Sequence, residues 1–146
     1  MSKSMKSLFP DVNVWLALNH EIHSHHLAAK TWFEEVDEQT ILVFCRQTQM
    51  GLFRLLTTQS VMGEEALTLR QCWRIYSRWI EGGRAELWNE PHGFESAFRH
   101  ESNTEEQSPK RWSDAYLSAF ARTTDSTLVT FDRALAGKTK DPILLG

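Results

Sequence analysis

Three aspartates occupy positions from which their side chains could converge. Asp11 and Asp132 each follow a short apolar run of strand length, and Asp114 follows Ser113, a good N-cap residue for a buried helix. Ligands of an open parallel sheet bind beyond the carboxyl ends of its strands. We therefore expect two strand ends and one helix start to bring these carboxylates to one site.

Three clustered carboxylates need cations, because like charges at close range raise one another's pKa values and burial adds to the cost of ionisation. Mg²⁺ and Mn²⁺ prefer hard oxygen ligands and bridge to substrate phosphates, so one of them is the expected cofactor. Such a site supports phosphodiester hydrolysis by metal-activated water. The alternative is an N-cap aspartate and two loop acids without a shared role, since the helix macrodipole alone favours Asp114 at a helix start. Spacing does not separate these interpretations.

Basic residues flank two of the aspartates. Lys110 and Arg111 precede Asp114, and Arg133 follows Asp132, so these three are candidates for contacting a phosphate of the substrate. The histidines between His20 and His26 could suggest zinc, but no cysteine or suitably spaced carboxylate lies near them. A loop at the mouth of the site is the favoured interpretation of that segment.

Length and composition favour one domain spanning residues 1–146, with residues 1–6 disordered. The chain has 146 residues, of which 41% are hydrophobic, enough for a sizeable core. A net charge of −3 argues against a strongly basic nucleic-acid-binding domain, so any such contact must be local or carried by metal ions. Cys45 and Cys72 lie in apolar or periodic stretches and are expected to be free and buried. No signal peptide or membrane span is expected, and a cytoplasmic location follows.

Apolar runs of strand length alternate with longer helical patterns, which is typical of α/β proteins with a parallel sheet flanked by helices. One stripe on the longest helix is formed by Leu69, Trp73, Tyr76 and Ile80. A polar loop is expected over 101–110. Strands are expected up to Asp11 and over 41–44, 86–88, 127–131 and 143–145, and helices after Asp11 and over 25–36, 47–56, 64–80, 94–99 and 114–122.

Four segments in order give a family resemblance that spans residues 8–145. Residues 10–16 (Pro-Asp-Val-Asn-Val-Trp-Leu), 112–117 (Trp-Ser-Asp-Ala-Tyr-Leu) and 129–133 (Val-Thr-Phe-Asp-Arg) resemble the acidic motifs of PIN-domain nucleases. Residues 45–57 resemble the second motif of VapC-type toxins of bacterial toxin–antitoxin pairs. The resemblance implies a three-layer PIN-like fold, a metal-dependent endoribonuclease acting on RNA, a homodimer, and a cognate antitoxin.

The resemblance also implies roles for individual residues. Asp11, Asp114 and Asp132 would be the metal ligands and catalytic residues. Three residues, Asn13, Gln49 and Thr130, would surround the metal ligands. Asn13 and Thr130 would hold the carboxylates by hydrogen bonds, as groups around a metal site commonly do.

One position departs from the family pattern. Many members carry a glutamate where this chain has Gln49, which brings a carbonyl oxygen but no charge. Reduced activity, a one-metal site, or replacement by Glu21 or an acid of the 101–106 segment are the open outcomes. The alternative function is a catalytically weak PIN-fold domain that binds antitoxin or RNA without efficient cleavage. A PIN nuclease of RNA maturation without an antitoxin is a further alternative.

Overall fold

Five parallel strands form the centre of the protein, in the order β3-β2-β1-β4-β5. The computed structural model describes residues 7–146, so the disorder predicted for residues 1–6 lies outside the described residues. Three of the strands are buried over their last three residues, as expected of a sheet covered on both faces. The strands are β1 (Ser7–Pro10), β2 (Ile41–Phe44), β3 (Ala85–Leu87), β4 (Thr127–Thr130) and β5 (Ile143–Leu144).

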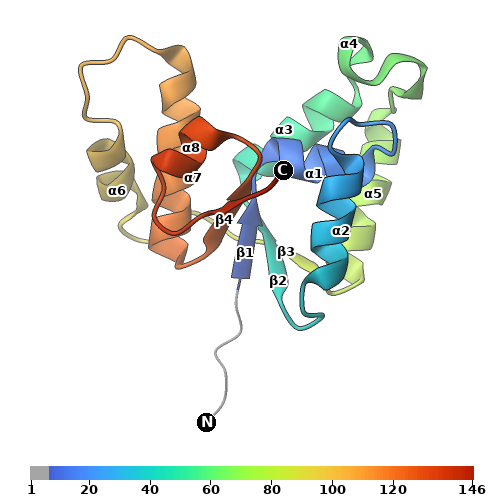
Figure 1. Ribbon diagram of the computed structural model, residues 1–146, viewed down its shortest axis with the longest axis horizontal. Helices are drawn as coiled ribbons and strands as arrows, with labels where there is room; N and C mark the ends of the chain where they lie inside the picture. The colour runs from blue at the N-terminus through green and yellow to red at the C-terminus, as the bar shows by residue number, and fades with distance from the viewer. Residues whose placement is uncertain (1–6) are drawn as a thin grey trace.

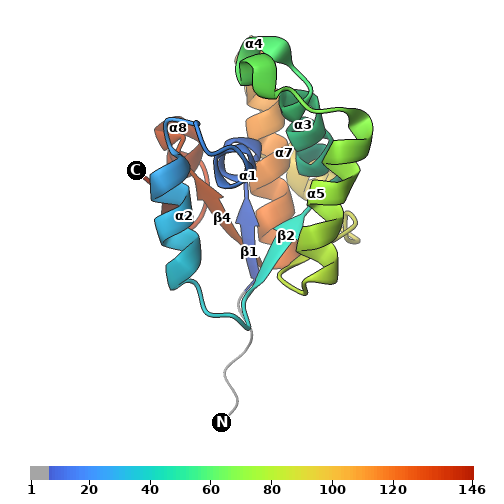
Figure 2. The same ribbon diagram turned by 90° about the vertical axis from the view of Figure 1, so that its right-hand side faces the viewer.

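Helices cover both faces of this sheet, which confirms the predicted three-layer α/β architecture (Figure 1). One layer holds α1 (Val12–Asn19), α2 (His26–Glu35), α3 (Arg46–Leu56), α4 (Gln59–Met62), a 3-10 turn (Gly63–Glu65) and α5 (Leu69–Glu81). The other holds α6 (Phe94–Glu101), α7 (Pro109–Thr124) and α8 (Arg133–Gly137). Figure 2 looks onto the first layer, with α2 on one side and α5 on the other.

Each interface between sheet and helices has its own aromatic core. On the α1 side, Trp15 is fully buried and stacks on Phe44 with ring centroids 3.8 Å apart. On the α7 side, Phe9 meets Phe120 at 4.8 Å. Large aromatic rings bury much area in few residues, so these pairs anchor α1 to β2 and α7 to β1.

Helix α7 begins earlier than the sequence predicted. The 114–122 helix with Ser113 as its N-cap is wrong, because α7 begins at Pro109 and Asp114 lies in its second turn. A proline in the sequence usually indicates a loop, but its fixed φ and missing N–H also suit the first position of a helix. The predicted 101–110 loop therefore shortens to residues 102–108.

Helices α5 and α8 also differ from the prediction. Helix α5 begins at Leu69 because Thr68 caps it, accepting a hydrogen bond from the Gln71 amide. Its predicted apolar stripe is only partly buried, since Leu69 and Trp73 are exposed. The short helix α8 was not predicted, since five residues carry little periodic signal.

Cys45 and Cys72 are free and buried, as predicted. Within residues 7–146, none of the helices combines the length and apolar character that crossing a membrane requires.

Candidate active site

The ends of β1 and β4 lie side by side at the point where the strand order reverses. The chain runs from β1 outward to β2 and β3, then crosses to β4 on the other side of β1. Pro10 pairs with Val129, and the Asp11 amide donates to the Val129 carbonyl at 3.0 Å. Asp11 and Asp132 thus leave neighbouring strands at the carboxyl edge of the sheet, where open α/β sheets bind their ligands.

Asp11 is buried and held from two directions. Its Oδ1 accepts a hydrogen bond from the Val14 amide at 3.0 Å, so it caps α1, and its Oδ2 accepts one from the Thr130 hydroxyl. Burial raises the pKa of Asp11 above its ordinary range, and the Thr130 and Val14 hydrogen bonds oppose that rise. The nearby charge of Asp132 adds to it. A bound cation would reverse the balance, because opposite charge favours the ionised carboxylate.

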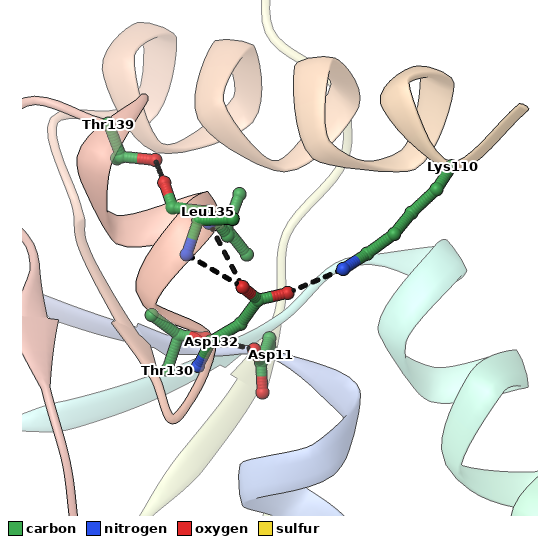
Figure 3. A network of polar contacts seen from close by, with 7 residues as sticks. Asp11, Lys110, Thr130, Asp132, Leu135 and Thr139 are labelled. Carbon is green, nitrogen blue, oxygen red and sulfur yellow. Dashed lines mark hydrogen bonds and ion pairs between the residues drawn. The ribbon is translucent and has the colours of Figure 1, made fainter. Parts of the chain in front are cut away.

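Asp132 caps α8 and meets a lysine. Its Oδ1 accepts from the amides of Ala134 and Leu135 at 2.9 and 3.1 Å, and its Oδ2 accepts from Lys110 Nζ at 2.8 Å (Figure 3). The hydrogen bond from Lys110 lowers the pKa of Asp132 below its ordinary range. The Thr130 hydroxyl oxygen accepts from the Asp132 amide at 2.9 Å, so one threonine connects both aspartates.

Asp114 reaches the same region from the helix layer. It is 6% exposed and lies four residues after Lys110 on α7, a spacing that puts both side chains on one helix face. The hydrogen bond to Asp132, followed by the charges of Asp132, Asp114 and Asp11, raises the pKa of Lys110. The Lys110–Asp132 ion pair therefore links the face of α7 that carries Asp114 to the chain segment after β4.

The three aspartates are oxygen donors of the kind that hard divalent cations prefer. Within residues 7–146, no group of three or more His, Cys, Asp or Glu side chains is close enough, as positioned, to hold a metal ion. The Lys110 ammonium supplies positive charge to Asp132, whose Oδ2 it contacts at 2.8 Å. Its side chain is 66% exposed, and exposed ion pairs of this kind contribute little, so the cost of displacing it is small.

Two of the residues expected to orient the aspartates lie elsewhere or face another partner. The Asn13 side chain is exposed, and its contribution to Asp11 is a main-chain amide. Gln49 is buried, and its Oε1 accepts from Arg46 Nη1 at 2.7 Å, so this carbonyl oxygen is already engaged. Thr130 alone of the three makes the expected side-chain contact with an aspartate.

The three basic residues predicted to contact phosphate have different surroundings. Lys110 lies in the site, whereas Arg111 donates to the Glu101 carbonyl at 3.0 Å and pairs with Glu106 at 3.6 Å, bracing the α6–α7 connection. Arg133 is exposed at the first position of α8.

The acids considered as replacements for a glutamate at position 49 have other surroundings. Glu21 is exposed after α1, while Glu101 and Glu106 pair with Arg122 and Arg111. None of these contacts places an acid beside Gln49.

The histidine segment approaches the site through one aromatic contact. His25 stacks on Phe131 with ring centroids 4.4 Å apart, and Phe131 lies between Thr130 and Asp132. Sequence reasoning placed this segment at the mouth of the site but did not identify Phe131 as its contact, since no local pattern links the two positions.

Comparison with known proteins supplies the family. No protein-family model matches the chain. The chain is 40% identical over 131 residues to ribonuclease VapC41 of Mycobacterium tuberculosis, a match that covers 87% of this chain and 90% of that protein. The same protein of a second strain matches equally.

Two solved structures share the fold. The crystal structure of Mycobacterium tuberculosis VapC20, a toxin that cleaves the sarcin-ricin loop, has a TM-score of 0.63 at 14% identity, covering 89% of this chain and 93% of that one. FitAcB from Neisseria gonorrhoeae has a TM-score of 0.58 at 13% identity, covering 94% and 96%. The fold is thus PIN-like, as predicted.

The chain belongs to the VapC family of PIN-domain ribonucleases. The family resemblance seen in the motifs is confirmed, and the nuclease prediction is favoured over a domain that binds without cleaving.

Proposed function

We propose that this protein is a Mg²⁺- or Mn²⁺-dependent endoribonuclease and the toxin of a toxin–antitoxin pair. The observation that carries the proposal is the placement of Asp11 and Asp132 at neighbouring strand ends, both hydrogen-bonded to Thr130, at the reversal point of the sheet. Asp114 is buried on the face of α7 from which Lys110 pairs with Asp132. These three carboxylates would hold the divalent ion. When bound, the ion would generate hydroxide from water and neutralise charge on the scissile phosphate.

The chain's own part is orientation of the carboxylates. Thr130 holds Asp11 by its hydroxyl group, and the amides at the starts of α1 and α8 hold one oxygen each of Asp11 and Asp132. Fixed carboxylates bind an ion in defined geometry without reorganising during the reaction. Recognition of RNA would rest on exposed bases and shape, as is usual for single-stranded or looped RNA.

Metal-dependent cleavage of total cellular RNA tests the proposal. The purified protein, freed of any bound partner, is incubated with Mn²⁺ or EDTA beside Asp114→Asn. A matched control is Asp125→Asn, which makes the same change at an exposed C-cap of the same helix with φ 55°, a conformation that asparagine adopts readily. We expect Asp114→Asn to abolish cleavage and leave the fold intact, because it removes like-charge repulsion in the metal-free site.

The outcomes separate the candidate functions. Discrete fragments that require Mn²⁺ and Asp114, with Asp125→Asn fully active, support the nuclease and show that Gln49 is tolerated. A folded protein that binds RNA without cutting it favours the binding-only domain. Cleavage that survives in Asp114→Asn places the chemistry elsewhere.

A homodimer and an antitoxin partner are part of the same proposal. Support for a contact surface comes from apolar side chains on α3 and α5, where exposed Trp73 packs against Phe53 at 4.9 Å, with Met50 and Leu69 exposed one turn away on each helix. Exposed apolar clusters of this kind mark protein contacts. Light scattering of the wild type against Trp73→Glu tests the dimer, and a monomeric wild type argues against it.

A further inference from the structure

Lys110 is positioned to exchange partners rather than to hold one permanently. It is the second residue of α7, four residues before Asp114, and its stem spans the gap to Asp132 after β4 (Figure 3). The side chain is 66% exposed, so most of it remains in water while its ammonium group makes one contact. Long exposed lysine side chains lose rotamer entropy when held in an ion pair, which limits the strength of such a pair.

The two oxygens of Asp132 have different roles. Oδ1 is held by two main-chain amides of α8, whereas Oδ2 accepts from Lys110. Departure of Lys110 would leave the carboxylate oriented, because the amides do not move with it. Oδ2 is therefore an oriented oxygen that can accept a different cation.

The charges of the aspartate cluster favour replacement of Lys110 by a divalent ion. Lys110 pairs with Asp132, and the two other aspartates of the cluster, Asp11 and Asp114, are buried. A divalent ion carries twice the charge of Lys110 and prefers oxygen ligands. The backbone of Lys110 is fixed at the start of α7, so a displaced ammonium group would stay near the carboxyl edge of the sheet, where an RNA phosphate would approach.

We propose that Lys110 is the counter-ion of the aspartate cluster in the metal-free protein, and that the incoming divalent ion displaces it from Asp132 and frees it for a phosphate of the RNA. This inference rests on the proposed function, since it requires Asp11, Asp114 and Asp132 to bind the ion. It gives Lys110 two successive partners, Asp132 and then a phosphate of the RNA.

Mn²⁺ affinity measured by calorimetry tests the exchange without any activity readout. Removal of the competing charge in Lys110→Met should tighten Mn²⁺ binding about fivefold to thirtyfold, from the repulsion of a unit charge near a divalent ion in largely aqueous surroundings. The control is Lys140→Met, which removes the same charge from an exposed residue beyond α8 and should leave affinity unchanged.

The accessibility of Lys110 gives a second readout in the wild-type protein. Lysine acetylation with a soluble active ester, quantified by mass spectrometry, should increase at Lys110 when Mn²⁺ saturates the protein and remain constant at Lys140. The increase is expected because the ammonium group loses its hydrogen-bond acceptor and gains a repelling neighbour.

The outcomes distinguish this inference from the proposed function. Equal Mn²⁺ affinity in wild type and Lys110→Met, with binding lost in Asp114→Asn, overturns the exchange and leaves the metal site standing. Unchanged acetylation at Lys110 under saturating Mn²⁺ also overturns it. Absence of Mn²⁺ binding in all variants overturns the metal site itself, and the exchange with it.

Discussion

Replacement of Thr130 by valine should weaken the fold through the two aspartates that it connects. Thr130 is fully buried on β4, where its hydroxyl donates to Asp11 Oδ2 and accepts from the Asp132 amide. Valine has the same shape, so the change removes both hydrogen bonds without opening a cavity. The substitution therefore isolates the contribution of the hydroxyl group.

The expected loss can be estimated from the two bonds. A hydrogen bond to a charged group contributes about 1.5–3 kcal/mol, and one between neutral groups about 0.5–1.5 kcal/mol. The second applies to the Asp132 amide, which is only partly buried. We expect the free energy of unfolding of Thr130→Val to fall by about 2–4 kcal/mol when Asp11 is ionised.

The loss of stability in Thr130→Val should be larger at high pH than at low pH. Burial raises the pKa of Asp11 in the folded state, so its ionisation disfavours folding as pH rises, and the Thr130 hydroxyl limits this effect. Thr130→Val raises the folded pKa further. The destabilisation should therefore be fully present above the raised pKa of Asp11 and shrink as pH falls through it to acid values.

Urea denaturation at pH 8 and at pH 4 measures this prediction. The midpoint should shift while the slope stays constant, which marks a change in stability rather than in compactness. Thr127→Val on the same strand is the control, because its half-buried side chain lies outside the aspartate network. A loss below about 0.5 kcal/mol at pH 8, or one equal to that of the control, would refute the reasoning, since charged hydrogen bonds contribute more than this.

Three further predictions concern the core, position 49 and the ion pair. Trp15→Ala should lower the free energy of unfolding, measured by urea denaturation, by about 3–5 kcal/mol, because Trp15 is fully buried. The control Trp112→Ala, at a 62% exposed residue, should change it by less than about 0.5 kcal/mol. Comparable losses in the two variants would contradict the assigned core. Gln49→Glu should change the Mn²⁺ affinity measured by calorimetry by no more than about twofold, because Arg46 would pair with the new carboxylate. Markedly tighter binding would show that position 49 does face the ion. Lys110→Met should cost at most about 1 kcal/mol at pH 7 in the metal-free protein, given the exposure of its ion pair. That cost should disappear as pH falls through the lowered pKa of its partner carboxylate, and a loss that persists in acid would exclude the ion pair as its cause.

Local sequence determined the strands and the places where two aspartates stand. The 41–44 strand was predicted with its observed bounds, since a run of large apolar residues between polar ones suits a strand buried on both faces. Asp11 and Asp132 were located near strand ends because an acidic residue after such a run leaves the sheet. Asp11 directly follows β1, and Asp132 lies two residues after the end of β4. These features depend on a few neighbouring residues, and a pattern can reveal them.

The contacts that make a site of these residues were decided by tertiary structure. Thr130 and Asp11 are 119 positions apart, and Lys110 and Asp132 are 22 apart, so no local periodicity relates them. The engagement of Gln49 by Arg46 depends on which face of α3 is buried. The early start of α7 at Pro109 is what turns Lys110 and Asp114 to one helix face. Packing of α7 across the sheet then brings that face to the end of β4, because a buried helix settles where its apolar residues fill the core, and the polar contacts at its end follow from that placement.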